Sequence, residues 1–239
     1  MQYTAQDLKE ALALLAQEDR KVQNLRFFKT GEADYGFGDE FIGVSVPDQR
    51  KVAKSFYPHI SLVALHKVIH SPIHEHRSCA LFILVLKFEK EKKIEVRKEI
   101  VRFYLENLSQ VNNWDLVDSS CYKILGRHCY ETGATDILFE LANQNNLWAN
   151  RIAIVSTMYF LKKDVYELTK KLAVKNMSHS HDLMHKANGW LLREMGKRSE
   201  EELIDFLNLH LKEMPRTTLR YTIEKLDPTL RLNYLNKRF

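Results

Sequence analysis

Long apolar runs, glycine and proline are all scarce in this sequence of 239 residues. No stretch approaches the eighteen or more apolar residues that a membrane-spanning helix requires. The N-terminal segment MQYTAQDLKEALALLAQEDR carries acids where a secretory signal needs a basic start and an apolar block. Because 45% of the residues are hydrophobic, the chain can still bury a substantial core. We therefore expect a globular, cytoplasmic protein that does not bind membranes.

Cysteine is also rare, and its pattern argues against two kinds of stabilised fold. Cys79, Cys121 and Cys129 are an odd number of thiols, lack Cys-x-x-Cys spacing and lie within apolar segments. This pattern is typical of reduced thiols in the core of a cytosolic protein. The sequence therefore predicts neither a disulfide framework nor a zinc site.

The histidines raise the question of a different metal site. Two groups are closely spaced, His74 with His76 and a second group of His179, His181 and His185. No cysteine or acidic residue accompanies them at the spacing of helical zinc sites. We interpret all five as surface histidines, and we expect no bound metal and no other cofactor.

Apolar residues recur at intervals of three and four along most of the chain, as they do on one face of a helix. Examples are Ala5, Leu8, Leu12 and Leu15, and later Leu203, Phe206, Leu207 and Leu211. Residues that favour helix starts precede several such segments, at Pro47, Pro72, Ser199, Pro215 and Pro228. The sequence predicts an all-α fold of about a dozen helices joined by short turns.

The segment GEADYGFGDEFIGVSVP, residues 31–47, departs from the helical pattern. It holds four of the eight glycines, and we expect it to form an extended loop. Glycine-rich loops can hold phosphate, but this one is acidic and lacks the Lys-Ser/Thr ending of a nucleotide-binding loop. We therefore exclude nucleotide binding at this loop.

A faint internal repeat favours a solenoid over a bundle. The strings NNWDLVD, NNLWANR and ANGWLLRE follow one another, with Trp114, Arg151 and Trp190 separated by 37 and 39 residues. This spacing is close to the period of about 40 residues in HEAT and armadillo helix-pair repeats. We predict a single domain over residues 1–239, a HEAT-like (armadillo-type) helical-repeat solenoid with a concave groove lined by equivalent positions.

Charge is unevenly distributed, although the formal net charge is only +5. Residues 1–46 hold five Lys/Arg against eight Asp/Glu, whereas residues 162–198 hold nine against four and residues 212–239 hold seven against three. A basic surface favours polyanions because each neutralised phosphate releases condensed counterions. The alternative is an ordinary solvated helix surface of mixed charge.

If the predicted repeats stack, several side chains that could take part in binding or catalysis converge. Trp114 and Asp118 are four residues apart and so project from one face of a helix. Stacked repeats would bring Arg151 and Trp190 to the same groove, and Lys186 would extend its basic lining. Each residue also has a plain structural interpretation, since tryptophans more often fill cores and an aspartate can cap a helix or pair with an arginine.

Four ordered segments, NNWDLVDSS, LWANRIAIVSTMYFLKK, HKANGWLLREMGKR and MPRTTLRYTIEKL, resemble the AlkD-like DNA alkylation repair family of HEAT-like-repeat DNA glycosylases. The resemblance runs over roughly residues 5–235. It implies a curved helical solenoid whose basic concave face holds duplex DNA, in a monomer of the bacterial cytosol or nucleoid. It also implies release of N3- and N7-alkylated purines, with the lesion left stacked and not rotated into a pocket.

The resemblance carries over to individual residues. The catalytic aspartate falls on Asp118, the groove tryptophans on Trp114 and Trp190, and the DNA-contacting arginine on Arg151. Further DNA-binding positions are the aromatic Phe27, the loop residues Ser45, Arg50 and Lys51, and the basic residues Lys186, Arg193, Lys197, Arg216 and Arg220. The sequence departs from the family pattern in having Asn113 where some members carry a second tryptophan and Phe27 where a tyrosine is found.

Elementary chemistry agrees with this assignment. An N3- or N7-alkylpurine is cationic, so its glycosidic bond is weak and its departure leaves an oxocarbenium-like sugar. A carboxylate at Asp118 can stabilise that cation and orient water, and indole rings attract cations. The leading hypothesis is a monofunctional alkylpurine DNA glycosylase. The alternatives are a non-catalytic HEAT-repeat protein that binds distorted or branched DNA, and a repeat scaffold for protein partners, which would need an exposed apolar groove.

Overall fold

The structure is a computed structural model that describes residues 2–236, and these residues confirm the all-α prediction. Within this range β-pairing is limited to two isolated bridges, Tyr3 with Ile60 and Glu40 with Ile73. The contacts divide the chain into two compact units, residues 1–120 and 121–239. The single domain and the repeat solenoid with a basic groove stay predictions, and each unit is described by itself.

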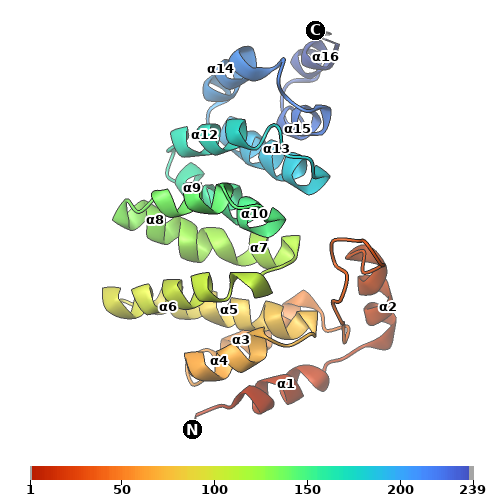
Figure 1. The fold of residues 1–239 in the computed structure, drawn as a ribbon, viewed down its shortest axis with the longest axis vertical. Coiled ribbons are helices and arrows are strands. Elements are labelled where there is room, and N and C mark those ends of the chain that lie inside the picture. The colour runs from red at the N-terminus through yellow and green to blue at the C-terminus, as the bar shows by residue number, and fades with distance from the viewer. Residues whose placement is uncertain (1, 237–239) are drawn as a thin grey trace. The chain divides into compact units, whose positions relative to one another are not determined.

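The first unit contains the helices drawn from red to yellow-green in Figure 1. In chain order they are α1 (Ala5–Ala13), α2 (Glu18–Phe27), α3 (Val46–Phe56), α4 (Leu62–Ile69), α5 (His74–Lys90), α6 (Ile94–Glu106), a 3₁₀ turn (Leu108–Gln110) and the start of α7 (Trp114–Cys121). Helices α1, α3, α4 and α6 all contact α5. Helix α5 is therefore the centre of this unit.

The sequence of α5 explains its central place. Its segment CALFILVLKF is apolar on every side, and Cys79 through Val85 are all buried. A helix that is apolar all round must be covered on all faces. The first turn of α5 is different, because there the buried residues are His74, Glu75, His76 and Arg77.

The predicted loop lies between α2 and α3, and α3 takes only its last two residues. The backbone of this loop pairs with the start of α5 and the residues before it: Glu40 donates to the carbonyl of Pro72 at 3.1 Å and accepts from the amide of His74 at 2.8 Å. Gly43 adopts a φ of +79°, and a Cβ there would stand 2.0 Å from the carbonyl oxygen of Gln17. Only glycine fits this close approach to α2.

The second unit contains the helices drawn from green to blue in Figure 1. After a π-helical turn (Tyr122–Gly126) they are α8 (Arg127–Thr132), α9 (Asp136–Ala142), α10 (Leu147–Ser156), α11 (Met158–Leu161), α12 (Glu167–Lys175), α13 (Asp182–Gly196), α14 (Glu200–His210), α15 (Arg216–Thr222) and α16 (Pro228–Asn236). Helix α13 contacts α10, α12, α14 and α15. It is the central helix of this unit.

Helices α13 and α15 approach each other closely because α13 has a glycine at the crossing. A Cβ on Gly189 would lie 2.4 Å from Cβ of Tyr221 and 2.6 Å from the carbonyl oxygen of Thr218. The next residue along α13 is Trp190, so this residue lies directly beside the crossing of the two helices.

The predicted helix starts are confirmed where the capping chemistry is local. Ser45 caps α3 by accepting from the amide of Asp48, and Pro47 lies in the first turn of that helix. Ser199 caps α14 in the same way, and Pro228 is the first residue of α16. The three cysteines are buried, as predicted. No helix within residues 2–236 is long and apolar enough to cross a membrane.

Candidate functional site

Trp114 and Asp118 both lie on α7, Trp114 as its first residue and Asp118 one turn later. They therefore share a face of this helix, as the spacing predicted. Both side chains are half-buried. The carboxylate of Asp118 is thus neither fully covered nor fully solvated, a setting in which its charge acts more strongly than it would in bulk water.

Three aromatic rings from distant parts of the sequence meet beside this face. Trp114 stacks on Phe28, with ring centroids 5.6 Å apart and planes inclined by 24°, and it meets Phe27 edge to face at 5.7 Å. Phe27 is 63% exposed. We call Phe27, Phe28 and Trp114 the aromatic surface. It brings together two of the predicted site residues, Phe27 and Trp114, which are 87 positions apart.

The aromatic surface continues inward to a buried imidazole. His74 is 2% exposed, and its ring lies 4.8 Å from the ring of Phe28 and 4.8 Å from that of Phe41. Its Nδ1 is 3.0 Å from Oδ2 of Asp39, and its Nε2 is 2.8 Å from Oδ2 of Asp115. His74 therefore connects the glycine-rich loop, α5 and α7.

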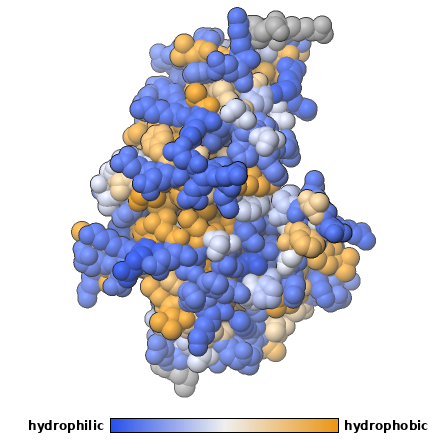
Figure 2. Space-filling model, in the orientation of Figure 1, coloured by the Kyte–Doolittle hydropathy of each residue, from blue (hydrophilic) through white to orange (hydrophobic). Residues whose placement is uncertain are grey.

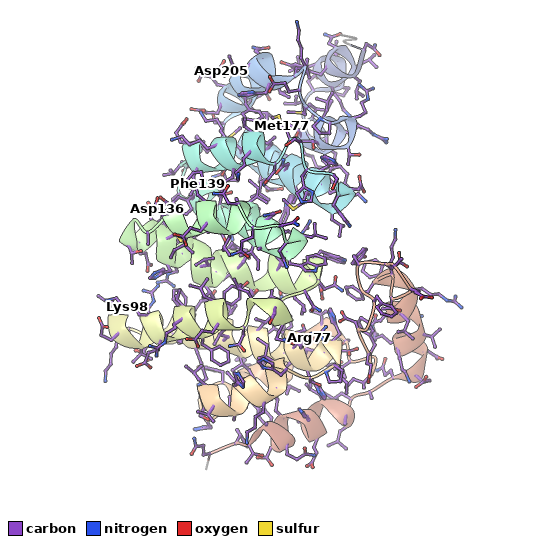
Figure 3. All side chains as sticks on the ribbon, viewed as in Figure 1. Arg77, Lys98, Asp136, Phe139, Met177 and Asp205 are labelled. Carbon is purple, nitrogen blue, oxygen red and sulfur yellow. The ribbon has the colours of Figure 1, made fainter. Side chains whose placement is uncertain are left out.

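Arg77 completes this group, which we call the charge cluster (Asp39, His74, Arg77 and Asp115). Arg77 is 4% exposed, donates to Oδ1 of Asp39 at 2.5 Å and lies in the first turn of α5, where Figure 3 labels it. Its other contacts are the carbonyl oxygens of Ser71 and Pro72. Two cations thus face two carboxylates, so each buried charge has a partner of opposite sign.

The charge cluster determines the protonation of His74. Burial works to lower the pKa of His74, but Asp115 and then Asp39 outweigh it and raise the pKa to about 9. Burial likewise works to raise the pKa of Asp39, yet the hydrogen bond to His74 and the charge of Arg77 hold it below its usual value. His74 is therefore an imidazolium at neutral pH, with both ring nitrogens donating.

Asn113 links the cluster to the backbone of α7. This side chain is fully buried, its Nδ2 donates to Oδ2 of Asp39 at 3.2 Å, and its Oδ1 accepts from the amide of Trp114 at 2.8 Å. The position at which the sequence departs from the family pattern thus holds the first residue of α7.

The prediction that His74 and His76 are surface histidines is wrong. His76 is 5% exposed, and its Nδ1 lies 2.9 Å from Oγ of Ser71. Burial, followed by the charges of Lys9 and Arg77, lowers the pKa of His76 to about 4. The segment IHEHRS looks solvated because five polar residues follow each other, and its burial depends on partners such as Asp39 that are distant in the sequence.

Glu75 is a buried carboxylate that the sequence did not single out. It is 1% exposed and accepts from the amide of Gly43 at 2.8 Å, from the amide of Ile42 at 3.1 Å and from Nδ2 of Asn24 at 3.3 Å. The carboxylate therefore joins α2 and the glycine-rich loop to α5, and supports the segment that carries Phe27.

Three predicted DNA-binding residues of the first unit, Ser45, Arg50 and Lys51, lie at the start of α3. Lys51 is exposed and forms an ion pair of 2.9 Å with Asp48, whose carboxylate also accepts from Oγ of Ser45 at 2.6 Å. Arg50 is exposed, and its guanidinium lies 4.2 Å from the centre of the Phe82 ring. Figure 2 shows a mainly hydrophilic face, with hydrophobic patches on the segment formed by α2 and the following loop.

In the second unit, Arg151 lies on α10 and Trp190 on α13. Arg151 is 5% exposed, and its Nη1 donates to the carbonyl oxygen of Leu183 at 2.6 Å. Trp190 is half-buried. Trp148, on the same helix as Arg151, is half-buried as well. The guanidinium of Arg151 therefore holds the first turn of α13, the helix that carries Trp190.

Two of the predicted DNA-binding cations, Lys186 and Arg220, line one hollow of about 450 Å³. Its other lining residues are Asp182 from α13, Thr217 and Tyr221 from α15, Glu224 from the turn after α15, and Arg231 from α16. Lys186 forms an ion pair of 2.8 Å with Asp182. This hollow can take an anionic group, because three cations outnumber its two carboxylates.

The remaining predicted cations of the second unit lie around the ends of helices. Arg193 pairs with Glu224, and Lys197 lies 2.6 Å from Glu194. Arg216 is exposed and donates to the carbonyl oxygen of Leu235 at 2.9 Å. Most of these cations thus already have an acidic or carbonyl partner in the protein without DNA.

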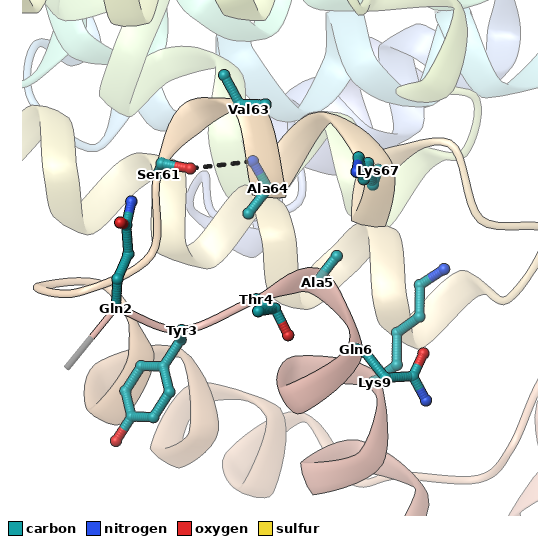
Figure 4. Close-up of a pocket in the computed structure, with 10 residues that line it drawn as sticks. All are labelled: Gln2, Tyr3, Thr4, Ala5, Gln6, Lys9, Ser61, Val63, Ala64 and Lys67. Carbon is teal, nitrogen blue, oxygen red and sulfur yellow. Dashed lines mark hydrogen bonds between the residues drawn. The ribbon is translucent and has the colours of Figure 1, made fainter.

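A hollow in the first unit is unrelated to the predicted site. The pocket in Figure 4 has a volume of about 520 Å³ and lies between the N-terminal segment and the start of α4, where Ser61 caps the helix. None of the predicted site residues lines it. Within residues 2–236, no group of three His, Cys, Asp or Glu side chains is placed to hold a metal ion.

Comparisons with known proteins place this arrangement in context. A family model described as DNA alkylation repair enzyme matches residues 8–226. Among solved structures, the chain is similar to a predicted DNA alkylation repair enzyme from Enterococcus faecalis, with a TM-score of 0.70 and 16% identity over 89% of this chain and 97% of that one. At this identity the likeness concerns the fold. No curated protein sequence matches the chain.

Proposed function

Because the chain belongs to the DNA alkylation repair enzyme family, we propose that it is a DNA glycosylase acting on cationic N3- and N7-alkylpurines in duplex DNA. It hydrolyses the bond between the base and the sugar and leaves an abasic site. The observation that supports this most directly is on α7, where a half-buried Asp118 lies one turn from Trp114, whose ring contacts the exposed Phe27.

The reaction needs little acid catalysis. The C1′–N9 bond breaks, its electron pair leaves with the purine, and the cationic base becomes neutral while the sugar becomes an oxocarbenium ion. Water then attacks C1′ and releases a proton. Asp118 has two roles in this scheme: its negative charge stabilises the cationic sugar, and its oxygens orient the water and accept the proton.

The aromatic surface supplies contacts suited to a cationic lesion. Phe27 is 63% exposed and Trp114 is half-buried one turn from Asp118, and cation–π contact with such rings is worth about 0.5–2 kcal/mol. Trp190 of the second unit stays a proposed DNA contact. No deep pocket is required for these contacts, which fits a lesion that stays stacked in the duplex.

The cations of both units bind the phosphates on either side of the lesion. In this proposal Arg50 and Lys51 hold the DNA backbone at α3, and the hollow with Lys186 and Arg220 holds it at α13 and α15. Phosphate contacts of this kind fix the register of the protein on the duplex without reading its sequence. Arg151 acts by holding α13 through its hydrogen bond to the carbonyl oxygen of Leu183.

The proposal is tested by incubating the protein with duplex that contains N7-methylguanine and measuring free base and abasic DNA. Asp118→Asn should reduce release at least 100-fold and leave duplex binding within a few-fold, because the carboxamide keeps the shape and loses the charge. Asp136→Asn, an exposed aspartate at the start of α9, is the matched control and should excise like the wild type.

Two outcomes would contradict the proposal. Equal excision by Asp118→Asn and the wild type would remove Asp118 from its role. Tight duplex binding by the wild type without any release of base would instead favour a non-catalytic protein that binds distorted or branched DNA.

A further inference from the structure

We propose that His74 is a positioning residue for the site on α7: held between Asp39 and Asp115, it fixes the first turn of this helix and so determines where Trp114 and Asp118 stand. Its effect on base excision rests on the proposed function, whereas its effect on Trp114 does not.

The first support is that Asp115 lies between the two site residues and depends on His74. Asp115 follows Trp114 directly and precedes Asp118 by three positions on α7. Its Oδ2 accepts from Nε2 of His74 at 2.8 Å, while its Oδ1 is buried and accepts no hydrogen bond within residues 2–236. The bond to His74 is therefore the contact that determines the position of this carboxylate.

The second support is that the imidazole of His74 packs against Phe28 of the aromatic surface. Phe28 lies between His74 and Trp114, with ring centroids 4.8 Å from the first and 5.6 Å from the second. Phe41 also stacks on His74, with ring centroids 4.8 Å apart and planes inclined by 21°, and its ring lies 5.2 Å from that of Phe28. A shift of the imidazole therefore moves Phe28, and Phe28 moves the indole of Trp114.

The third support is that the protonated form of His74 is the one that satisfies both carboxylates. A neutral imidazole has one N–H donor and would present a lone pair to either Asp39 or Asp115. The charged groups facing His74 are Asp39 from the loop, Asp115 from α7 and, through Asp39, Arg77 from its own helix. Deprotonation breaks one of the two bonds that position α7.

The pH range follows from this arrangement. Asp115 and Asp39 raise the pKa of His74 to about 9, against the opposing effect of its burial. The positioning is thus intact at neutral pH and is lost as the pH rises through 9. Asp115→Asn removes the strongest influence that raises this pKa, so in that variant the loss should occur at a lower pH.

The kinetic test measures single-turnover excision of N7-methylguanine between pH 6 and pH 10. The wild type should lose activity above a midpoint near pH 9. Asp115→Asn should move this midpoint down by at least one pH unit, and His74→Gln should lower the excision rate at pH 7 about 10- to 100-fold, since small misplacements have effects of this size. The affinity of both variants for the duplex should differ from that of the wild type by less than three-fold. His66→Gln, an exposed histidine on α4, is the control and should keep the wild-type profile.

A second readout does not need excision. In a variant with Trp148→Phe and Trp190→Phe, the fluorescence of Trp114 should titrate with a midpoint near pH 9. Adding His74→Gln should abolish this titration, and adding Asp115→Asn should lower its midpoint. Circular dichroism verifies that each variant is folded. If His74→Gln does not fold, Asp115→Asn alone tests the proposal.

The outcomes separate the two proposals. An unchanged alkaline midpoint in Asp115→Asn, in both readouts, would overturn the positioning role. A wild type that excises nothing while Trp114 still titrates near pH 9 and responds to both substitutions would remove the glycosylase function and leave the positioning role supported.

Discussion

Replacing Glu75 by glutamine changes one oxygen of a buried carboxylate into an NH₂ group at a point where three donors converge. The carboxylate accepts from the amides of Ile42 and Gly43 and from the side chain of Asn24. The least disruptive orientation keeps an oxygen towards Gly43 and Asn24. The new NH₂ group then faces the amide of Ile42, and two buried donors are left opposite each other.

The expected loss of stability follows from these contacts. A hydrogen bond to a charged acceptor contributes about 1.5–3 kcal/mol, and an unsatisfied buried donor costs about 1–3 kcal/mol. Because the remaining bonds to Gly43 and Asn24 also become weaker, we expect Glu75→Gln to destabilise the first unit by about 3 kcal/mol. For a chain of this size that corresponds to a melting temperature lowered by about 6–12 °C.

The assay compares thermal unfolding of the wild type, Glu75→Gln and Glu89→Gln by circular dichroism. Glu89 is an exposed residue of the same helix, α5, so its substitution should change the free energy of unfolding by less than about 0.5 kcal/mol. Amide hydrogen exchange adds a local measurement, in which Ile42 and Gly43 should exchange faster in Glu75→Gln.

The reasoning would be refuted by a melting temperature of Glu75→Gln within 2 °C of the control. Unchanged exchange at Ile42 and Gly43 would show, in addition, that another group holds the glycine-rich loop on α5.

Three further perturbations are informative. Gly189→Ala should cost about 1–3 kcal/mol by overpacking α13 against Tyr221, which urea unfolding measures, and a neutral result would mean that α15 can move away. The pKa of His76 is about 4 in the folded protein and 6.5 in the unfolded chain, so the stability that its neutral form contributes is present above pH 6.5 and is lost as the pH falls through 4. The midpoint of thermal unfolding should therefore decline from pH 6.5 to pH 4 in the wild type, and should decline less in His76→Gln. Arg151→Ala should lower the melting temperature, because the hydrogen bond to Leu183 is lost, and should flatten the salt dependence of duplex binding by about one unit of slope. An unchanged slope with a lower melting temperature would give Arg151 a role within the fold alone.

The helical part of the fold was predictable because its signals are local. Ser45 and Ser199 cap helices through hydrogen bonds to amides three residues away, and Pro228 begins a helix as its fixed φ favours. The glycine-rich segment interrupts this pattern, and the loop was predicted for the same reason. Signals that act over three or four residues can be recognised without knowing the tertiary structure.

The charge cluster was not predictable from the sequence because its bonds are not local. His74 finds its two carboxylates 35 positions before it and 41 positions after it. In the sequence, IHEHRS has the composition of a solvated turn, and only the partners Asp39 and Asp115 make its burial possible. The contact between Phe27 and Trp114 is equally remote, so the resemblance indicated both residues and only the structure brings their rings together.

The pairing of the basic residues has a consequence for how the protein would search a chromosome. Lys51, Lys186 and Lys197 each lie within 3 Å of a carboxylate of the same chain. When such a lysine moves to a phosphate, the carboxylate it leaves attracts a cation from solution, which cancels part of the gain from ions released by the duplex. Undamaged DNA would consequently be held more loosely than the number of positive side chains suggests. Dissociation from intact stretches would be fast, and a longer stay would depend on the contacts that an alkylated base adds.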